Sequence, residues 1–337
     1  MKALVYTAPG KVELQNISTP HAKSDEVIVR VQFAGICGSD MGGFLGHHAR
    51  RQPPLVLGHE MVGIVKESSQ EKFPCGKRVV VNPLLPCFRC SNCLSGRHNT
   101  CYRWKLLGMD NVQGAFAEQV SVPVSSLFSI PENLPDEVAV LPEPVACAVH
   151  LLSMIESDKF GTLAILGAGT QGILVLILAK LLGYQSILIT DINQKRLSVA
   201  SQLGATQILN PSEIDLVSSV HDLTDGLGVE VVVDAVGSSS TRQQATEICQ
   251  SGGQVILLGL AEQKTEIDFM NLVRREIQLQ TSFGYNMNDF SKAVSLVVSG
   301  KVNVTPWTEI KMIEEGQMAF EKMINNPSST IKMILRP

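Results

Sequence analysis

The spacing of hydrophobic and polar residues divides the chain into two patterns. Up to about residue 140, short apolar runs alternate with turns rich in glycine, proline and polar residues, and residues 27–33 form the clearest run. Further runs of this kind lie at 64–66 and 79–81. Short apolar runs bounded by turn signals are typical of β-strands. We therefore predict that this part consists mostly of strands and loops, including a glycine- and histidine-rich loop at 42–51.

The pattern changes after Pro142-Glu143-Pro144, where longer apolar runs are separated by helix-like or polar stretches. The runs that resemble strands are 163–166, 187–190, 231–235, 254–258 and 277–282. Such alternation predicts a parallel sheet covered on both faces by helices.

The last part of the chain has helix-like segments at 289–299 and 314–325 and short strand-like runs at 307–310 and 331–335. We predict that this part returns to the first domain. The expected architecture is α/β, with a β-rich domain formed by residues 1–144 and completed by 284–337, and a doubly wound parallel sheet at 145–283.

Composition narrows the class of protein. The chain has 337 residues, of which 45% are hydrophobic and 18% charged, and a formal net charge of -4. These values suit a globular enzyme with a large core and give no reason to expect nucleic acid or an anionic membrane as a partner. Residues 173–182 are too short to span a bilayer, which takes ~20 residues. Met1 leads directly into a strand-like run, so no signal peptide is expected.

Eight cysteines without an export signal favour a reducing compartment, and we expect the protein to be cytoplasmic. Metal binding or catalysis then explains the cysteines better than disulfides do.

The first candidate site is a glycine-rich turn after the run at 163–166. Gly167, Gly169 and Gly172 have G-x-G-x-x-G spacing, with Thr170 and Gln171 inside the turn. Glycines at these positions let a backbone turn tightly and approach a pyrophosphate at a helix N-terminus. A glycine turn in an ordinary strand–helix–strand unit is the alternative.

Asp191 supports dinucleotide binding, because it follows the last glycine by ~20 residues, where a carboxylate can accept hydrogen bonds from a ribose hydroxyl. A carboxylate there also repels a 2′-phosphate, so NAD is the expected cofactor. Lys195 and Arg196 lie close enough in the sequence to soften that preference.

The second candidate site is a four-cysteine loop. Cys87, Cys90, Cys93 and Cys101 are separated by two, two and seven residues. Four thiolates at this spacing can surround one tetrahedral zinc ion, and a closed shell of this kind is structural. Two disulfides or an iron–sulfur cluster are the alternatives.

The third candidate site is a second, open metal centre. Cys37 follows a strand, His59 lies between Gly58 and Glu60, and Glu143 lies between two prolines. A Cys/His/carboxylate shell leaves a position for water or substrate. Ordinary core residues are the alternative, but a nicotinamide that oxidises an alcohol needs a group that stabilises an alkoxide, and a Lewis acid does so.

Together these motifs resemble the zinc-dependent medium-chain dehydrogenases, of the branch that contains sorbitol, threonine and galactitol-phosphate dehydrogenases. The resemblance covers essentially the whole chain. It rests on Gly35-Ile36-Cys37-Gly38-Ser39-Asp40, Gly58-His59-Glu60-Met61-Val62-Gly63, the four cysteines, Glu143-Pro144 and the glycine turn. It implies a GroES-like catalytic domain beside a Rossmann domain, with the active site in the cleft between them.

The resemblance also implies roles for single residues. Cys37 and His59 match the ligands of a catalytic zinc, and Glu60 and Glu143 match two carboxylates that ligate it directly or through water. Ser39 matches a hydroxyl that carries the substrate proton outward. Asp40 matches a carboxylate that orients the ligand histidine.

One position departs from the pattern. Many relatives have a relay histidine two residues after Asp40, where this chain has Gly42, followed by Gly43. His47 or His48 can be considered as a substitute, although a solvated loop histidine is the simpler interpretation. Arg50 and Arg51 can be considered as partners of an acidic or phosphorylated substrate, and a solvated basic pair is the alternative.

The expected activity is oxidation of a secondary alcohol on a polyol or sugar derivative, with one catalytic zinc, one structural zinc and NAD. Threonine and simple alcohols are the alternative substrates. A zinc-free quinone or enoyl reductase and a non-catalytic cofactor-binding protein are the alternative classes. Because residues 277–282 would form an exposed sheet edge, we expect a homodimer or a homotetramer.

Overall fold

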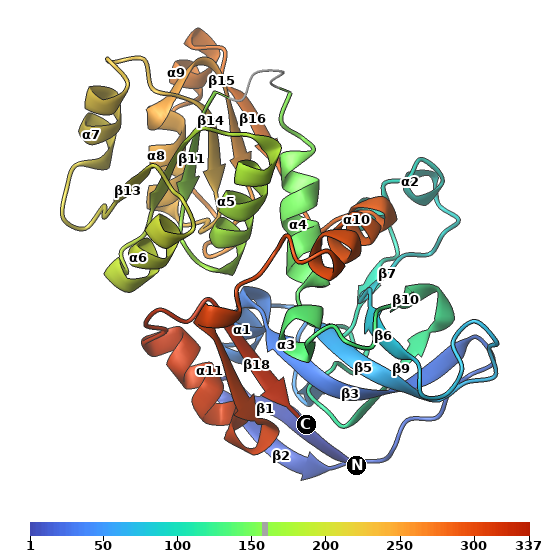
Figure 1. Ribbon diagram of the computed structural model, residues 1–337. Coiled ribbons are helices and arrows are strands. Elements are labelled where there is room, and N and C mark those ends of the chain that lie inside the picture. The colour runs from blue at the N-terminus through green and yellow to red at the C-terminus, as the bar shows by residue number, and fades with distance from the viewer. Residues whose placement is uncertain (157–160) are drawn as a thin grey trace. The chain divides into compact units, whose positions relative to one another are not determined.

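The computed structural model describes residues 1–156 and 161–337. It divides into two compact units (Figure 1), one formed by 1–146 and 285–337 and the other by 147–284. Because the chain leaves the first unit and returns to it, the first unit is discontinuous.

The first unit is built mostly from antiparallel strands, and its β17–β18 pair is parallel. Its largest sheet has the order β10-β6-β5-β3-β18-β17, with β9 paired to β3, and a smaller sheet has the order β2-β1-β4. The strands are β1 (Lys2–Ala8), β2 (Lys11–Asn16), β3 (Glu26–Ile36), β4 (Leu55–Val56), β5 (Glu60–Glu67), β6 (Arg78–Val81), β9 (Gln119–Pro123), β10 (Leu127–Ser129), β17 (Thr308–Met312) and β18 (Lys332–Arg336). The helices are α1 (Gly38–Phe44), α3 (Asp136–Ala139), α10 (Met287–Val298) and α11 (Gly316–Asn325), with single 3₁₀ turns at Val124–Ser126, Thr305–Trp307 and Ile313–Glu315.

The C-terminal segment completes the core of this unit. Strand β18 pairs with the end of β3, where Met333 lies opposite Ile36. Phe320 of α11 stacks on Phe44 at 4.9 Å between ring centroids and meets Phe116 edge-on at 5.9 Å. All three rings are buried, so the helix supplies part of the hydrophobic core under the sheets.

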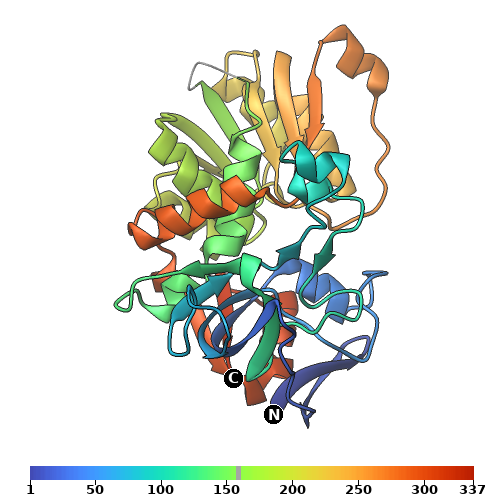
Figure 2. The same cartoon turned by 90° about the vertical axis from the view of Figure 1, so that its right-hand side faces the viewer.

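The four-cysteine segment projects from its own unit. In Figures 1 and 2 the segment that carries α2 (Ser91–Leu94) extends away from the β-sheets of that unit. It also contains a 3₁₀ turn at His98–Thr100 and is joined to the sheets by the short pair β7 (Leu84–Leu85) and β8 (Lys105–Leu106).

The second unit is a six-stranded parallel sheet with the order β13-β12-β11-β14-β15-β16. Its strands are β11 (Thr162–Leu166), β12 (Ser186–Thr190), β13 (Gln207–Leu209), β14 (Val229–Asp234), β15 (Cys249–Leu257) and β16 (Gln278–Thr281). Its helices are α5 (Thr170–Leu182), α6 (Gln194–Gln202), α7 (Leu216–Leu223), α8 (Ser239–Ile248) and α9 (Phe269–Arg274), and α4 (Pro142–Leu152) leads into it. The strand order reverses beside β11, as in doubly wound dinucleotide-binding folds.

Helices cover both faces of the parallel sheet, with α5 and α6 on one face and α8 on the other (Figure 1). A buried cluster that includes Leu216, Val220, Ala245 and Ile248 fastens α7 and α8 to the sheet. The expected α/β architecture, with a β-rich part and a doubly wound parallel sheet, is confirmed.

One sequence prediction about local structure is wrong, and one strand was not predicted. Residues 42–44 belong to α1 and not to a loop, although Gly-Ser-Asp-Met-Gly-Gly-Phe has low helix propensity. Tertiary contacts outweigh that propensity, because Phe44 at the end of α1 packs against Phe320. Strand β13 was not predicted, since its three residues include a glutamine and give no clear apolar run.

No helix among the described residues is both long enough and apolar enough to cross a membrane.

Candidate metal centres and dinucleotide site

The ends of two neighbouring strands bring together a possible metal-binding group. Cys37 follows β3 and is the N-cap of α1, and His59 and Glu60 lie at the start of β5. Because β3 and β5 are antiparallel, with Gly35 opposite Glu60, the end of one strand lies beside the start of the other. One ligand atom from each of Cys37, His59 and Glu60 lies within 4.8 Å of the other two. A thiolate, an imidazole and a carboxylate form a donor set that suits zinc.

Asp40 orients the histidine of this group. Its Oδ1 lies 3.2 Å from Nδ1 of His59, and its Oδ2 accepts a hydrogen bond from the backbone N–H of Cys37 at 3.1 Å. Burial raises the pKa of Asp40, but the charges of His59 and Arg51 outweigh burial and bring the pKa to about 2. A carboxylate on Nδ1 leaves Nε2 as the ligand nitrogen, the arrangement found around metal-bound histidines.

Glu60 is paired with a lysine from the last strand of the chain. Its Oε2 forms an ion pair with Nζ of Lys332, and both side chains are buried. Lys332 also donates a hydrogen bond to the carbonyl of Ile36 at 3.1 Å. Gly35 provides the space for this pair, because a Cβ there would lie 2.2 Å from Oε2 of Glu60 and 2.6 Å from Cε of Lys332.

Glu143 lies in the first turn of α4 and does not belong to the group of atoms within 4.8 Å. Burial raises the pKa of its carboxyl to about 7, and the charge of Glu60 acts in the same direction. His59, Lys332 and the hydroxyl of Tyr285 favour its ionised form. The structure therefore brings three of the four predicted ligands together and places the fourth within electrostatic reach.

The two arginines of the segment after α1 have internal partners. Arg50 forms three hydrogen bonds to the carboxylate of Asp110 and lies over the ring of Trp104 at 3.8 Å. Arg51 contacts Ser39 and Asp40. Arg51 is therefore not the solvated residue considered as one alternative, whereas the side chain of Arg50 is 37% exposed, and each arginine has a carboxylate beside it.

The two histidines of this segment differ in exposure. His47 is exposed, whereas His48 is half-buried and its Nδ1 accepts a hydrogen bond from the backbone N–H of Arg50 at 3.3 Å. Burial and the neighbouring arginines lower the pKa of His48.

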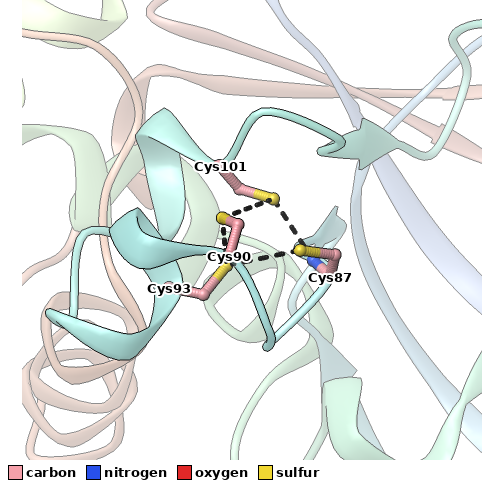
Figure 3. A group of neighbouring side chains, drawn as sticks. All are labelled: Cys87, Cys90, Cys93 and Cys101. Atoms are coloured by element: carbon pink, nitrogen blue, oxygen red, sulfur yellow. Dashed lines mark hydrogen bonds between the residues drawn. The ribbon is translucent and has the colours of Figure 1, made fainter.

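The four cysteines of the projecting segment surround one point (Figure 3). Their sulfur atoms all lie within 4.8 Å of one another, and Cys90 lies 3.5 Å from Cys93 and 3.9 Å from Cys101. Around a zinc ion with ~2.3 Å bonds, tetrahedral sulfurs are about 3.8 Å apart. These separations fit a four-thiolate metal site and are too long for disulfides, and all eight cysteines are free.

The electrostatics of this cluster also favour a cation. A hydrogen bond from the backbone N–H of Cys93 lowers the pKa of the Cys90 thiol to about 6. Burial and the neighbouring thiols raise the pKa of Cys93 to about 12. Four thiolates this close repel one another unless a cation lies between them, so the residues present fit a structural zinc ion.

The glycine turn joins β11 to α5 in the second unit. Gly167 has a φ of +101°, and a Cβ at Gly172 would lie 1.8 Å from the carbonyl oxygen of Gly167. Gly169 is the N-cap of α5, so Thr170 and Gln171 form the first turn of the helix. Only glycine fits at 172, and the turn leaves the N-terminus of α5 available to a pyrophosphate.

Asp191, directly after β12, also supports this turn. Its Oδ2 accepts a hydrogen bond from the backbone N–H of Ala168 and its Oδ1 accepts one from that of Asn193, both at 2.8 Å. Burial lowers the pKa of Arg196, while the charge of Asp191 acts in the opposite direction. The carboxylate is therefore fixed beside the glycine turn, with a guanidinium near it.

Three residues near the first metal group were not predicted to belong to it: Lys332 pairs with Glu60, Arg51 contacts Asp40, and Tyr285 hydrogen-bonds Glu143. Arg51 was considered only as a substrate partner, and Tyr285 gave no signal. Lys332 stands alone among apolar residues at 331–335 and is fully buried. A lysine is almost never fully buried without a partner, so its place in an apolar strand could have indicated one.

Comparison with protein families matches two parts of the chain. Residues 23–132 match the alcohol dehydrogenase GroES-like domain, and residues 172–299 match the zinc-binding dehydrogenase domain. These matches confirm the GroES-like and Rossmann architecture.

Several characterised and uncharacterised proteins are similar over the whole chain. An uncharacterised zinc-type alcohol dehydrogenase-like protein, YdjJ of Escherichia coli, is 32% identical, with 98% of this chain and 97% of that protein covered. Sorbitol dehydrogenase of Bacillus subtilis is 30% identical over 100% of this chain and 97% of its own length. L-threonine 3-dehydrogenase of Pyrococcus horikoshii is 31% identical over 100% of this chain and 99% of its own length.

Two of the solved structures that are similar to this chain contain a nicotinamide cofactor. A zinc-binding dehydrogenase of Sinorhizobium meliloti bound to NADP has a TM-score of 0.90 and 30% identity, covering 100% of this chain and 99% of that one. An alcohol dehydrogenase of Escherichia coli CFT073 complexed with NADH has a TM-score of 0.91 and 25% identity over the same shares of the two chains.

The four-cysteine cluster predicts a specific response to the loss of one ligand. Replacing Cys93 by serine should remove one bound metal per chain and lower the unfolding temperature, because metal binding energy is also folding energy. Metal content by mass spectrometry and thermal unfolding check this result. Cys75→Ser, at an exposed free cysteine, is the control and should change neither quantity. A Cys93→Ser protein with wild-type metal content would contradict a zinc site here.

Proposed function

Because this chain belongs to the zinc-binding medium-chain dehydrogenases, we propose that it oxidises a secondary alcohol of a polyol or sugar derivative with NAD⁺. The group of Cys37, His59 and Glu60 carries this proposal. A thiolate, an imidazole and a carboxylate gathered beside an orienting aspartate suit an open zinc centre, and the same chain has a glycine turn suited to a dinucleotide.

The proposed site has a defined division of roles. Cys37 and His59 hold the catalytic zinc, and Glu60 or Glu143 completes its shell. When bound, zinc would supply a Lewis acid able to stabilise an alkoxide, and a nicotinamide would supply a hydride acceptor. Ser39 takes the proton from the substrate hydroxyl and passes it on, and Asp40 keeps the ring of His59 oriented.

The four-cysteine cluster is proposed to hold a second, structural zinc. Its closed set of four sulfurs offers no position for substrate, and its role is to order the projecting segment. The proposal therefore includes one catalytic and one structural zinc per chain. Free cysteines throughout the chain agree with a reducing compartment, and we propose the cytoplasm.

A neutral substrate is favoured over an acidic or phosphorylated one. Arg51 is buried against Asp40, and the half-buried Arg50 is paired with Asp110, so each guanidinium already has a carboxylate partner within the chain. Relatives that act on sorbitol or threonine support a small polar alcohol. Threonine, another amino alcohol or a simple alcohol is the second candidate.

A substrate panel tests the proposed reaction. We expect reduction of NAD⁺ with one or more hexitols or pentitols and weaker activity with sugar phosphates, aldonic acids and threonine. Activity should be lost after chelator treatment or in a Cys37→Ser variant, because the alkoxide then lacks a Lewis acid. Full activity of Cys37→Ser after chelation would refute the metal role. Two metals per chain without turnover of any alcohol would favour a cofactor-binding protein.

The cofactor preference is a second prediction. Asp191 should repel the 2′-phosphate of NADP. The kcat/KM value should therefore favour NAD by roughly tenfold or more, which corresponds to a difference of about 1.4 kcal/mol in transition-state stabilisation between the two cofactors. Asp191→Asn should narrow the difference, because the repelling charge is removed. Steady-state kinetics with both cofactors measure it. Equal kcat/KM values in the wild-type enzyme would count against this role of Asp191, as would an unchanged ratio in the variant.

A two-fold dimer through the β16 edge is the proposed assembly, with a tetramer as its possible doubling. Strand β16 is the last strand of its sheet. On α9, which precedes it, Phe269, Met270 and Val273 are 65%, 63% and 74% exposed. Exposed apolar side chains on α9 and an open strand edge both suit pairing with a second copy.

Light scattering tests the assembly. The wild-type protein should have a dimeric or tetrameric mass, and Val273→Asp should shift it toward the monomer by placing a charge in the apolar patch. Leu181→Asp, at a 49% exposed leucine of α5, is the matched control and should leave the mass unchanged. A monomeric wild-type protein would end this proposal.

A further inference from the structure

Arg51 is the largest of the fully buried side chains among the described residues, with 1% of its surface exposed. Arginines are almost never fully buried unless they are paired. The proposed reaction assigns no role to this residue, and its position so close to the metal-binding group calls for one.

The guanidinium of Arg51 makes four polar contacts. Nη1 donates a hydrogen bond to the carbonyl of Ser39 at 2.7 Å, and Nη2 donates one to Oγ of Ser39 at 3.2 Å. Nε donates to the carbonyl of Gly108 at 3.2 Å. Nη2 also lies 3.5 Å from Oδ1 of Asp40. One side chain therefore contacts both the proposed proton carrier and the carboxylate that orients His59.

Asp40 connects Arg51 to the metal ligands. The same Oδ1 lies 3.2 Å from Nδ1 of His59 and accepts a hydrogen bond from the backbone N–H of Gly58 at 3.4 Å. Its side chain has no exposed surface. A carboxylate buried in this way is costly unless an opposite charge and hydrogen bonds compensate it. The guanidinium supplies a permanent positive charge at this place.

The surrounding chain accommodates and anchors the arginine. A Cβ at Gly43 would lie 2.5 Å from Cδ of Arg51, so a side chain there would displace the arginine. The preceding residue, Arg50, is anchored by Asp110 and by the ring and carbonyl of Trp104. The backbone that carries Arg51 is therefore held in place as well.

We propose that Arg51 is a positioning residue of the Cys37–His59 centre. Its guanidinium holds Asp40 against His59 and fixes the hydroxyl of Ser39. This inference rests on the proposed function. A guanidinium only donates hydrogen bonds, so Oγ of Ser39 accepts from Arg51 and its own hydrogen points to another acceptor. A proton that reaches Ser39 leaves by a route that does not include Arg51.

Metal affinity of the Cys37–His59 centre tests the proposal without reference to a substrate. Arg51→Met should lower the affinity of this centre for Zn²⁺ by about 10- to 100-fold, the usual effect of removing a partner that orients a metal ligand. Competition with a chromophoric chelator measures it. Co²⁺ exchanged into this centre alone reports the ligand geometry by its visible spectrum, which should change in the variant.

Arg51→Lys separates the two parts of the role. Lysine keeps the buried charge but lacks the planar fork that reaches Ser39 and Asp40 together. We expect it to restore much of the metal affinity and to leave kcat for the best alcohol of the panel reduced. A lysine variant with wild-type kcat and wild-type affinity would overturn the proposal, even where Arg51→Met does not fold.

Arg78→Met is the matched control. Arg78 is another buried arginine of the first unit, paired with Asp136 and with backbone carbonyls at 131, 132 and 134. Its loss should lower the unfolding temperature and leave the metal affinity unchanged. An equal fall in metal affinity for both arginine variants would show a general loss of stability and overturn the proposal. A wild-type protein whose Cys37–His59 centre binds no metal would instead reject the proposed function.

Discussion

The candidate metal centre depends on the contacts of one buried carboxylate, that of Asp40. It lies one turn after Cys37 and beside His59, and it receives Arg51 from the segment that follows α1. The side chain is removed from water, so its negative charge must be balanced within the protein. The backbone of Cys37 and the ring of His59 contact this buried anion directly, and Ser39 is connected to it through Arg51.

A second buried ion pair, between Glu60 and Lys332, lies beside the end of β3. Lys332 reaches Glu60 from β18, and Gly35 leaves the space in which the two meet. The end of β3 is therefore flanked by one ion pair from the C-terminal strand and another from the segment after α1. Since both pairs are internal, they shape the site without offering free charge, which agrees with a neutral alcohol as substrate.

In the second unit, one carboxylate serves the fold and the proposed cofactor site. Both oxygens of Asp191 accept backbone hydrogen bonds, one of them from Ala168 inside the glycine turn. The residue proposed to recognise the ribose is thus part of the structure that shapes the pyrophosphate site. This double role explains why the carboxylate is held in place before any ligand binds, which reduces the ordering that binding requires.

The sequence by itself determined what depends on local chemistry. Spacing alone placed Gly167, Gly169 and Gly172 in one turn, in which Gly167 and Gly172 have no room for a side chain. It also grouped the four cysteines, because thiols at this spacing can surround one metal ion. The alternation of apolar runs predicted the parallel sheet. Only the tertiary structure decided which distant charges meet: Glu60 with Lys332, Asp40 with Arg51, and Arg50 with Asp110. It also made a helix of the glycine-rich α1, through packing of Phe44 on Phe320. Partners far apart in the chain leave no spacing to read, since strand pairing and the closing of the core bring them together.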